Sequence, residues 1–129
     1  MATLRSHKLI NCAPDAAWEV ISDAAGISEW FPAIRSSVGD GKSRTVTLDN
    51  GTVLHENIVT CDSKLRRFQY CIVGGDLVVE SHLGTIDAID VGNGWSLVVY
   101  STEIDPDGLA DEFGPAIAAA VENLSNVVS

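Results

Sequence analysis

One acidic side chain, Glu56, lies in a segment that otherwise has the pattern of an apolar strand face. Alternation over residues 52–61 gives that face four members, which are Leu54, Glu56, Ile58 and Thr60. Burial would raise the pKa of the Glu56 carboxyl, because desolvation disfavours its charged form, and would suit it to proton transfer. Three roles therefore stay open for Glu56: proton transfer, contact with a ligand, and a structural pairing with an arginine or a hydroxyl.

His82 supplies a second group with acid–base chemistry, because imidazole titrates near neutral pH. Glu56 and His82 together form a candidate proton-transfer pair across a shared cavity. His55 has the opposite strand parity to Glu56, so we expect it on the outer face. His55-Glu56 also begins the pattern H-E-x-x-H, but Val59 occupies the place of the second histidine, and that zinc motif requires a helix. This excludes metalloprotease chemistry, and we expect neither a metal nor a cofactor.

Other chemical signatures are missing from the sequence. It contains no G-x-S-x-G, Walker A or G-x-G-x-x-G pattern. Cys12, Cys61 and Cys71 lack C-x-x-C spacing, so we interpret them as reduced strand residues and expect a cytoplasmic protein. The longest apolar runs are too short to cross a bilayer, so we expect no membrane span.

Charge is distributed unevenly along the 129 residues, whose formal net charge is −10. All 8 Lys and Arg residues lie at or before Arg67, so residues 68–129 contain acidic residues but no Lys or Arg. Nucleic acid is not an expected partner, because phosphate binding requires a basic face. The acidic half predicts a solvated surface, with docking of a basic protein partner as the alternative.

Tight-turn signals divide the middle of the chain into strands. The signals are Asp40-Gly41, Asn50-Gly51, Asp62-Ser63, Gly74-Gly75 and Asn93-Gly94. The strands between them are predicted at residues 33–39, 43–49, 52–61, 66–73, 77–90 and 95–104. Alternation from Leu4 to Cys12 predicts a first strand, and Pro14 begins two short helices after it.

The end of the chain predicts one long helix over residues 109–128. Its apolar face recurs every three or four positions. The members of this face are Leu109, Phe113, Ile117, Val121, Leu124 and Val128. We expect Pro115 to kink the helix or delay its start. Alanines at 116 and 118–120 make the middle of the helix thin, which predicts free space beside it.

This element order predicts an α+β fold in a single domain over residues 1–129. A short sheet can cover such a helix only by curling round it. The sequence therefore predicts a curved, seven-stranded antiparallel sheet wrapped round the C-terminal helix, with a cavity between them.

Several stretches of the chain carry a resemblance to a known family. They are residues 13–23, Trp30-Phe31-Pro32, residues 43–51 leading to Glu56, residues 62–70 and residues 72–75. They resemble the polyketide cyclase/dehydrase branch of the START-like, SRPBCC superfamily. The resemblance covers nearly the whole chain and implies a helix-grip fold with a deep hydrophobic pocket under the long helix. The family includes ligand carriers, plant hormone receptors and aromatase/cyclases.

The resemblance also implies pocket positions. Glu56 matches an acidic residue that family members direct into the pocket, and His82 falls where related receptors carry a polar aromatic. Gly84 departs from the hormone-receptor branch, where this position is often polar. The expected ligand-binding residues are Phe31, Leu54, Glu56, Tyr70, Ile72, His82, Tyr100, Ala116, Ala119, Ala120 and Asn123. Glu56 and His82 are the candidate catalytic residues.

Three functions are consistent with these patterns. The first is binding of a small hydrophobic molecule, polyketide-like, aromatic or lipid-like, by a monomer or homodimer. The alternative is a metal-independent polyketide cyclase, dehydratase or aromatase that uses Glu56 or His82 to move a proton. The third is a protein-interaction module that uses the acidic C-terminal half.

Overall fold

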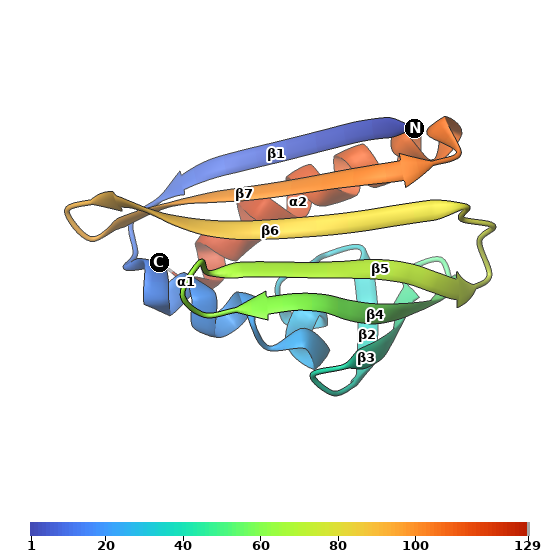
Figure 1. Cartoon of the computed structure of the whole chain (residues 1–129), viewed down its shortest axis with the longest axis horizontal. Coiled ribbons are helices and arrows are strands. Elements are labelled where there is room, and N and C mark those ends of the chain that lie inside the picture. Colours follow the sequence, from blue (N-terminus) through green and yellow to red (C-terminus); the bar gives the residue numbers. More distant parts are fainter. Residues whose placement is uncertain (129) are drawn as a thin grey trace.

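The chain folds into one curled antiparallel sheet that holds a long helix (Figure 1). The computed structural model describes residues 1–128. The 7 strands lie in the order β1-β7-β6-β5-β4-β3-β2. They are β1 (Ala2–Ile10), β2 (Ile34–Gly39), β3 (Ser43–Leu48), β4 (Val53–Asp62), β5 (Arg67–Gly75), β6 (Ser81–Gly92) and β7 (Trp95–Asp105). The helices are α1 (Pro14–Ile21) and α2 (Ala110–Val128), with short 3-10 turns η1 (Ala24–Glu29) and η2 (Asp107–Leu109). This confirms the predicted α+β fold.

Most predicted turns are where the sequence signals them. Asn93 and Gly94 both have positive φ, 58° and 78°, and join β6 to β7, as a two-residue hairpin with the twist of its strands requires. The turn predicted at Gly74-Gly75 is wrong, because both glycines belong to β5 and the chain turns over residues 76–80 instead. For that reason β6 starts at Ser81 rather than at residue 77.

Helix α2 runs along the inner face of the sheet and lies closest to β1 and β7 (Figure 1). Its buried residues are Ile117, Ala120, Val121 and Leu124. The helix begins at Ala110 and contains Pro115, so the expected delay of its start does not occur. The strands farther from α2 are therefore left without this helix against them, and β2 and β3 contact η1 instead.

An aromatic cluster fills the part of the core that lies next to Leu124 of α2. The rings of Trp30, Phe31 and Tyr100 lie 6.0 to 6.2 Å apart, centre to centre, in tilted and edge-on arrangements that suit aromatic pairs. Trp30 and Tyr100 are fully buried, and Leu124 of α2 is buried in the same core. This region is filled with side chains.

Within residues 1–128, no helix combines the length and the apolar character that crossing a membrane requires.

Candidate functional site

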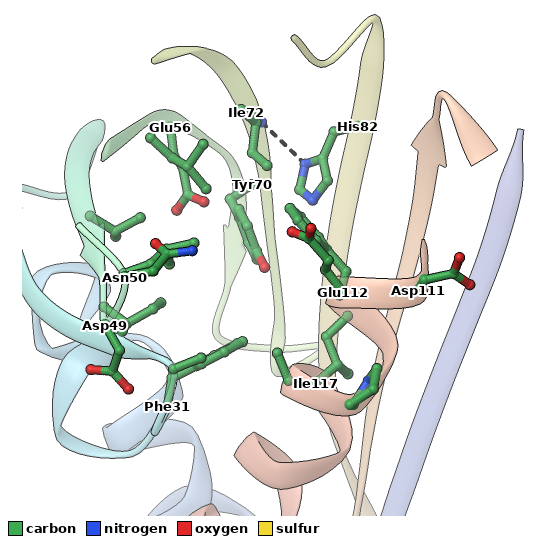
Figure 2. Close-up of a pocket in the computed structure, with 18 residues that line it drawn as sticks. Phe31, Asp49, Asn50, Glu56, Tyr70, Ile72, His82, Asp111, Glu112 and Ile117 are labelled. Carbon is green, nitrogen blue, oxygen red and sulfur yellow. Dashed lines mark hydrogen bonds between the residues drawn. The ribbon is translucent and has the colours of Figure 1, made fainter. Parts of the chain in front are cut away.

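A cavity of about 500 Å³ lies between the sheet and the first part of α2 (Figure 2). Its apolar wall comes from four strands and the helix. The main apolar members are Ile34, Val46, Leu48, Leu54, Ile72 and Ile117. The exposed residues Asp49, Asn50, Asp111 and Glu112 also border the cavity. Because exposed residues border it, the cavity opens to solvent between the β3–β4 turn and the start of α2.

Glu56 lies in the cavity wall and is bound from behind by Arg44. The Arg44 Nε donates to Glu56 Oε1 over 2.7 Å, and its Nη1 donates to the Ala24 carbonyl over 2.8 Å. The Arg44 guanidinium also lies 4.7 Å from the centre of the Tyr70 ring and 5.4 Å from that of Phe68. Such cation–π contacts and a direct ion pair offset the cost of burying the charge. Of the three roles left open, the structure shows the pairing with an arginine.

Burial and the ion pair act on Glu56 in opposite directions. The side chain is only 4% exposed, so desolvation raises the pKa of the Glu56 carboxyl, while the charge and hydrogen bond of Arg44 lower it. Burial is the larger effect, and the pKa of Glu56 lies above its ordinary value. Figure 2 shows the carboxylate directed into the cavity. Glu56 can therefore accept a hydrogen bond from a bound molecule while Arg44 holds its other side.

His82 is held in one tautomer by the backbone of the neighbouring strand. The Ile72 N–H donates to His82 Nδ1 over 3.1 Å, so Nδ1 carries a lone pair and the proton of the neutral ring is on Nε2. Pairing of β5 with β6 ends at Tyr70 and Gly84, so this imidazole takes the place of the next bond in the ladder. Burial, together with the positive charge of Arg44, lowers the pKa of His82 to about 4. His82 is therefore neutral at neutral pH and presents an N–H to the cavity.

Tyr70 forms the floor between these two groups. Its hydroxyl hydrogen-bonds the Tyr100 hydroxyl, so the ring face borders the cavity and the polar end points into the core. Burial raises the pKa of the Tyr70 hydroxyl well above its ordinary value. Gly84 makes room for the ring, because a Cβ at this position would lie 2.5 Å from a Tyr70 ring carbon. The departure from the receptor pattern at Gly84 thus has a packing reason.

The comparisons with known proteins agree with this geometry. The family model described as polyketide cyclase/dehydrase and lipid transport matches residues 1–126. The chain belongs to this family. A search of curated proteins found no significant match.

Several solved structures are similar to this member of the family. XoxI from Bacillus cereus has 24% identity and a TM-score of 0.88, with 99% of this chain and 96% of that chain covered. A START superfamily protein from Mycobacterium smegmatis has 11% identity and a TM-score of 0.82, covering 98% and 96%. Norcoclaurine synthase from Thalictrum flavum, in complex with dopamine and hydroxybenzaldehyde, has 20% identity and a TM-score of 0.75, covering 98% and 86%. At these identities the likeness shows the fold.

Most of the residues predicted to line the pocket border the cavity. They are Phe31, Leu54, Glu56, Tyr70, Ile72, His82 and Ala116. His55 lies on the outer face as expected, where its Nδ1 is 3.0 Å from the Thr45 hydroxyl.

Four predicted lining residues lie elsewhere. Tyr100 is fully buried behind Tyr70, and Ala120 is fully buried in the core. Ala119 is exposed on the outside of α2, and the Asn123 Nδ2 donates to the Trp30 carbonyl over 3.0 Å. The placement of these four residues in the pocket is therefore wrong. The physical reason is that α2 closes onto the sheet beyond Ile117, so the cavity lies under the helix start.

Sequence reasoning also missed Arg44, the partner of Glu56. Arg44 is 3% exposed and shares strand parity with the buried Val46. That parity was a usable signal, because a charged residue in phase with buried apolar residues requires a buried counter-charge. The acidic residues at the cavity mouth could not be found in this way. Asp49 and Glu112 are exposed, and an exposed charge needs no buried counter-charge.

Proposed function

We propose that this family member binds a small hydrophobic molecule, aromatic, polyketide-like or lipid-like, in the cavity beneath α2. The observation that supports this most is a cavity of about 500 Å³ with an apolar wall and few polar groups. Ligand sites typically have this size and composition, with affinity from apolar burial and orientation from a few polar atoms. The family description, which includes lipid transport, agrees with such a role.

Two polar groups would orient the ligand. His82 offers a donor, Nε2–H, and Glu56 offers an acceptor, its carboxylate. Both groups are fixed before a ligand arrives, His82 by Ile72 and Glu56 by Arg44. A molecule with an oxygen near His82 and a hydroxyl or N–H near Glu56 would satisfy both.

The same pair supports a second candidate function, a cyclase or dehydratase of polyketide-like substrates. The Nδ1 lone pair of His82 is engaged by Ile72, and Nε2 already carries a proton, so His82 cannot act as the base. Glu56 would remove a proton from carbon, and His82 would donate a hydrogen bond to the carbonyl oxygen as negative charge develops on it. In this proposal Glu56 is the base and His82 is only a hydrogen-bond donor, whereas the sequence predicted that either residue could move the proton.

Filling the cavity tests the binding proposal. Ala116 borders the cavity, whereas Ala118 is exposed on the same helix, so Ala116→Phe and Ala118→Phe form a matched pair. We expect Ala116→Phe to weaken binding of the neutral dye N-phenyl-naphthylamine about tenfold by occupying the site, and Ala118→Phe to leave it unchanged. Fluorescence titration measures both affinities. Equal affinities for the two variants would place the binding site elsewhere.

Glu56→Gln tests the enzymatic candidate. The amide keeps the shape and an acceptor for Arg44 but cannot take a proton. With a reactive poly-β-carbonyl compound as probe, we expect its cyclisation or loss of water to slow about 100-fold, while dye affinity persists. Mass spectrometry of the products measures the rate. A wild-type protein that binds the dye but does not convert the probe would favour the carrier role.

A further inference from the structure

We infer that the cavity selects neutral or cationic apolar molecules and discriminates against apolar anions such as fatty-acid carboxylates. The inference rests on the proposed binding function and names the chemical class of its ligand. Acidic side chains surround the cavity mouth, and the hydrogen-bond donor His82 Nε2–H faces its interior.

The mouth of the cavity carries negative charge from two separate elements. Asp49 belongs to the β3–β4 turn, and Asp111 and Glu112 belong to the first turn of α2. Figure 2 shows Asp49 on one side of the cavity and Glu112 on the other, with Asp111 directed outward beside it. Acidic residues in a first helical turn also stabilise the helix, but Asp49 lies in no helix. Helix stabilisation therefore does not explain the whole set.

No basic side chain compensates this charge within the described lining, which contains neither Lys nor Arg. Arg44 is buried behind the wall and already paired with Glu56. Arg35 follows the lining residue Ile34 but is exposed and does not border the cavity. Lys8 forms its ion pair with Glu122, in the later part of α2. A carboxylate entering the mouth would therefore meet acidic groups with no Lys or Arg of the described lining to balance it.

Inside the cavity, His82 offers a hydrogen-bond donor to the ligand. The side chain is 8% exposed, and its Nε2 has no hydrogen-bond partner among residues 1–128. Figure 2 shows this nitrogen directed into the cavity, away from the Ile72 bond. A ketone, ether or hydroxyl oxygen can accept from this N–H without bringing a charge next to Glu56. The matching ligand thus has an uncharged oxygen at its inner end and, where it is charged, an ammonium group at its outer end.

Three probes of matched size test this selectivity: naphthylethylamine, naphthylethanol and naphthylacetate. We expect the amine to bind about tenfold more tightly than naphthylacetate at low salt, with the alcohol between them, and the ratio to shrink at high salt. Calorimetric titration of the wild-type chain measures the three affinities. Equal affinities, or tightest binding of naphthylacetate, would overturn the inference and leave the binding function standing. Binding of none of the probes, nor of the neutral dye, would overturn both.

Charge-neutral variants locate the effect. In Asp49→Asn/Asp111→Asn/Glu112→Gln, the three carboxylates at the mouth no longer create a negative electrostatic potential. We therefore expect the ratio of the affinities for naphthylethylamine and naphthylacetate to fall to about one.

The control removes the same amount of charge elsewhere. Glu19, Glu29 and Asp90 are exposed and do not border the cavity, and the Asp90 bond to the Gly92 N–H survives as Asn. We expect Glu19→Gln/Glu29→Gln/Asp90→Asn to keep the wild-type ratio. A ratio that falls equally in both triple variants would show that net charge alone is responsible and would overturn the assignment to the mouth.

Discussion

The two halves of α2 meet the same sheet in different ways. Beyond Ile117 the helix is packed directly on the core, and Ala120 and Leu124 are fully buried. Before Ile117 the helix stands over the cavity, with Phe113 and Ala116 only half-buried. Small residues let a helix approach its neighbour closely, so Ala120 closes a gap that the sequence was expected to leave open. The cavity arises at the other end, beside Phe113 and Ala116.

The two regions also differ in chemistry. Aromatic and aliphatic side chains such as Trp30, Tyr100 and Leu124 fill the closed region. The open region instead contains a buried ion pair and a buried neutral imidazole. Apolar packing tolerates gradual change, whereas a buried polar group depends on its specific partner. Substitutions in the two regions should therefore have different costs and different remedies.

The largest effect is expected from removing Arg44. In Arg44→Leu, Glu56 remains buried without its cation, which should lower the free energy of unfolding by about 4 kcal/mol. Glu56→Leu alone should also destabilise the fold, since it leaves the buried Arg44 guanidinium without its counter-charge. The double variant Arg44→Leu/Glu56→Leu should recover most of the loss, because no unpaired charge remains. Urea denaturation of the three variants measures this, and a double variant no better than Arg44→Leu would contradict it.

The next effect concerns the acid stability that depends on His82. Its folded pKa of about 4 lies below the ordinary value of 6.5, so the folded state favours the neutral ring. This preference stabilises the folded state in full above about pH 6.5. The stabilisation is lost as the pH falls toward 4, which lowers the free energy of unfolding by about 3 kcal/mol. His82→Gln keeps an acceptor for Ile72 but does not titrate, so its unfolding free energy should fall less between neutral pH and pH 4.

The matched control for His82 is His55→Gln, because His55 lies exposed on the same sheet. Denaturation at a series of pH values measures the difference. His55→Gln should follow the wild-type curve. A His82→Gln curve parallel to the wild type would show that the imidazole does not determine acid stability.

The smallest expected effect is the difference in stability cost between a Leu→Ala substitution in the closed core and one beside the cavity. Leu124→Ala removes a fully buried side chain from the closed core and should cost about 3 kcal/mol. Leu54 is also buried but borders the cavity, so it has fewer contacts to lose, and Leu54→Ala should cost about 2 kcal/mol. Thermal and urea unfolding measure both values. Equal costs would show that the region around the cavity is packed as tightly as the core.

The sequence predicted the fold well because its signals are local. Asn93-Gly94 requires a hairpin whatever surrounds it, and the period of Ile117, Val121 and Leu124 defines the buried face of α2. The first strand was misplaced by two residues, since it spans Ala2–Ile10 rather than Leu4 to Cys12. Alternation alone does not show where pairing with β7 stops.

The site was less predictable because it depends on distances between elements. Strand parity correctly placed Leu54 and Glu56 in the wall, and the same rule applied to Arg44 would have found the ion pair. Which part of α2 leaves the sheet depends on how the helix crosses the strands, and no single residue such as Ala116 or Ala119 encodes it. The tautomer of His82 likewise follows from where β5 and β6 separate.

The bond from Ile72 to His82 also makes one backbone amide a spectroscopic reporter of the cavity. This amide proton lies on the imidazole lone pair, not on a carbonyl, so its NMR resonance and its exchange with solvent depend on the state of the ring. A ligand that accepts a hydrogen bond from Nε2–H makes Nδ1 a stronger acceptor, because the two nitrogens share one π-system. Occupancy of the cavity is thereby transmitted through a single aromatic ring to the peptide chain, where it can be followed without a label on the ligand.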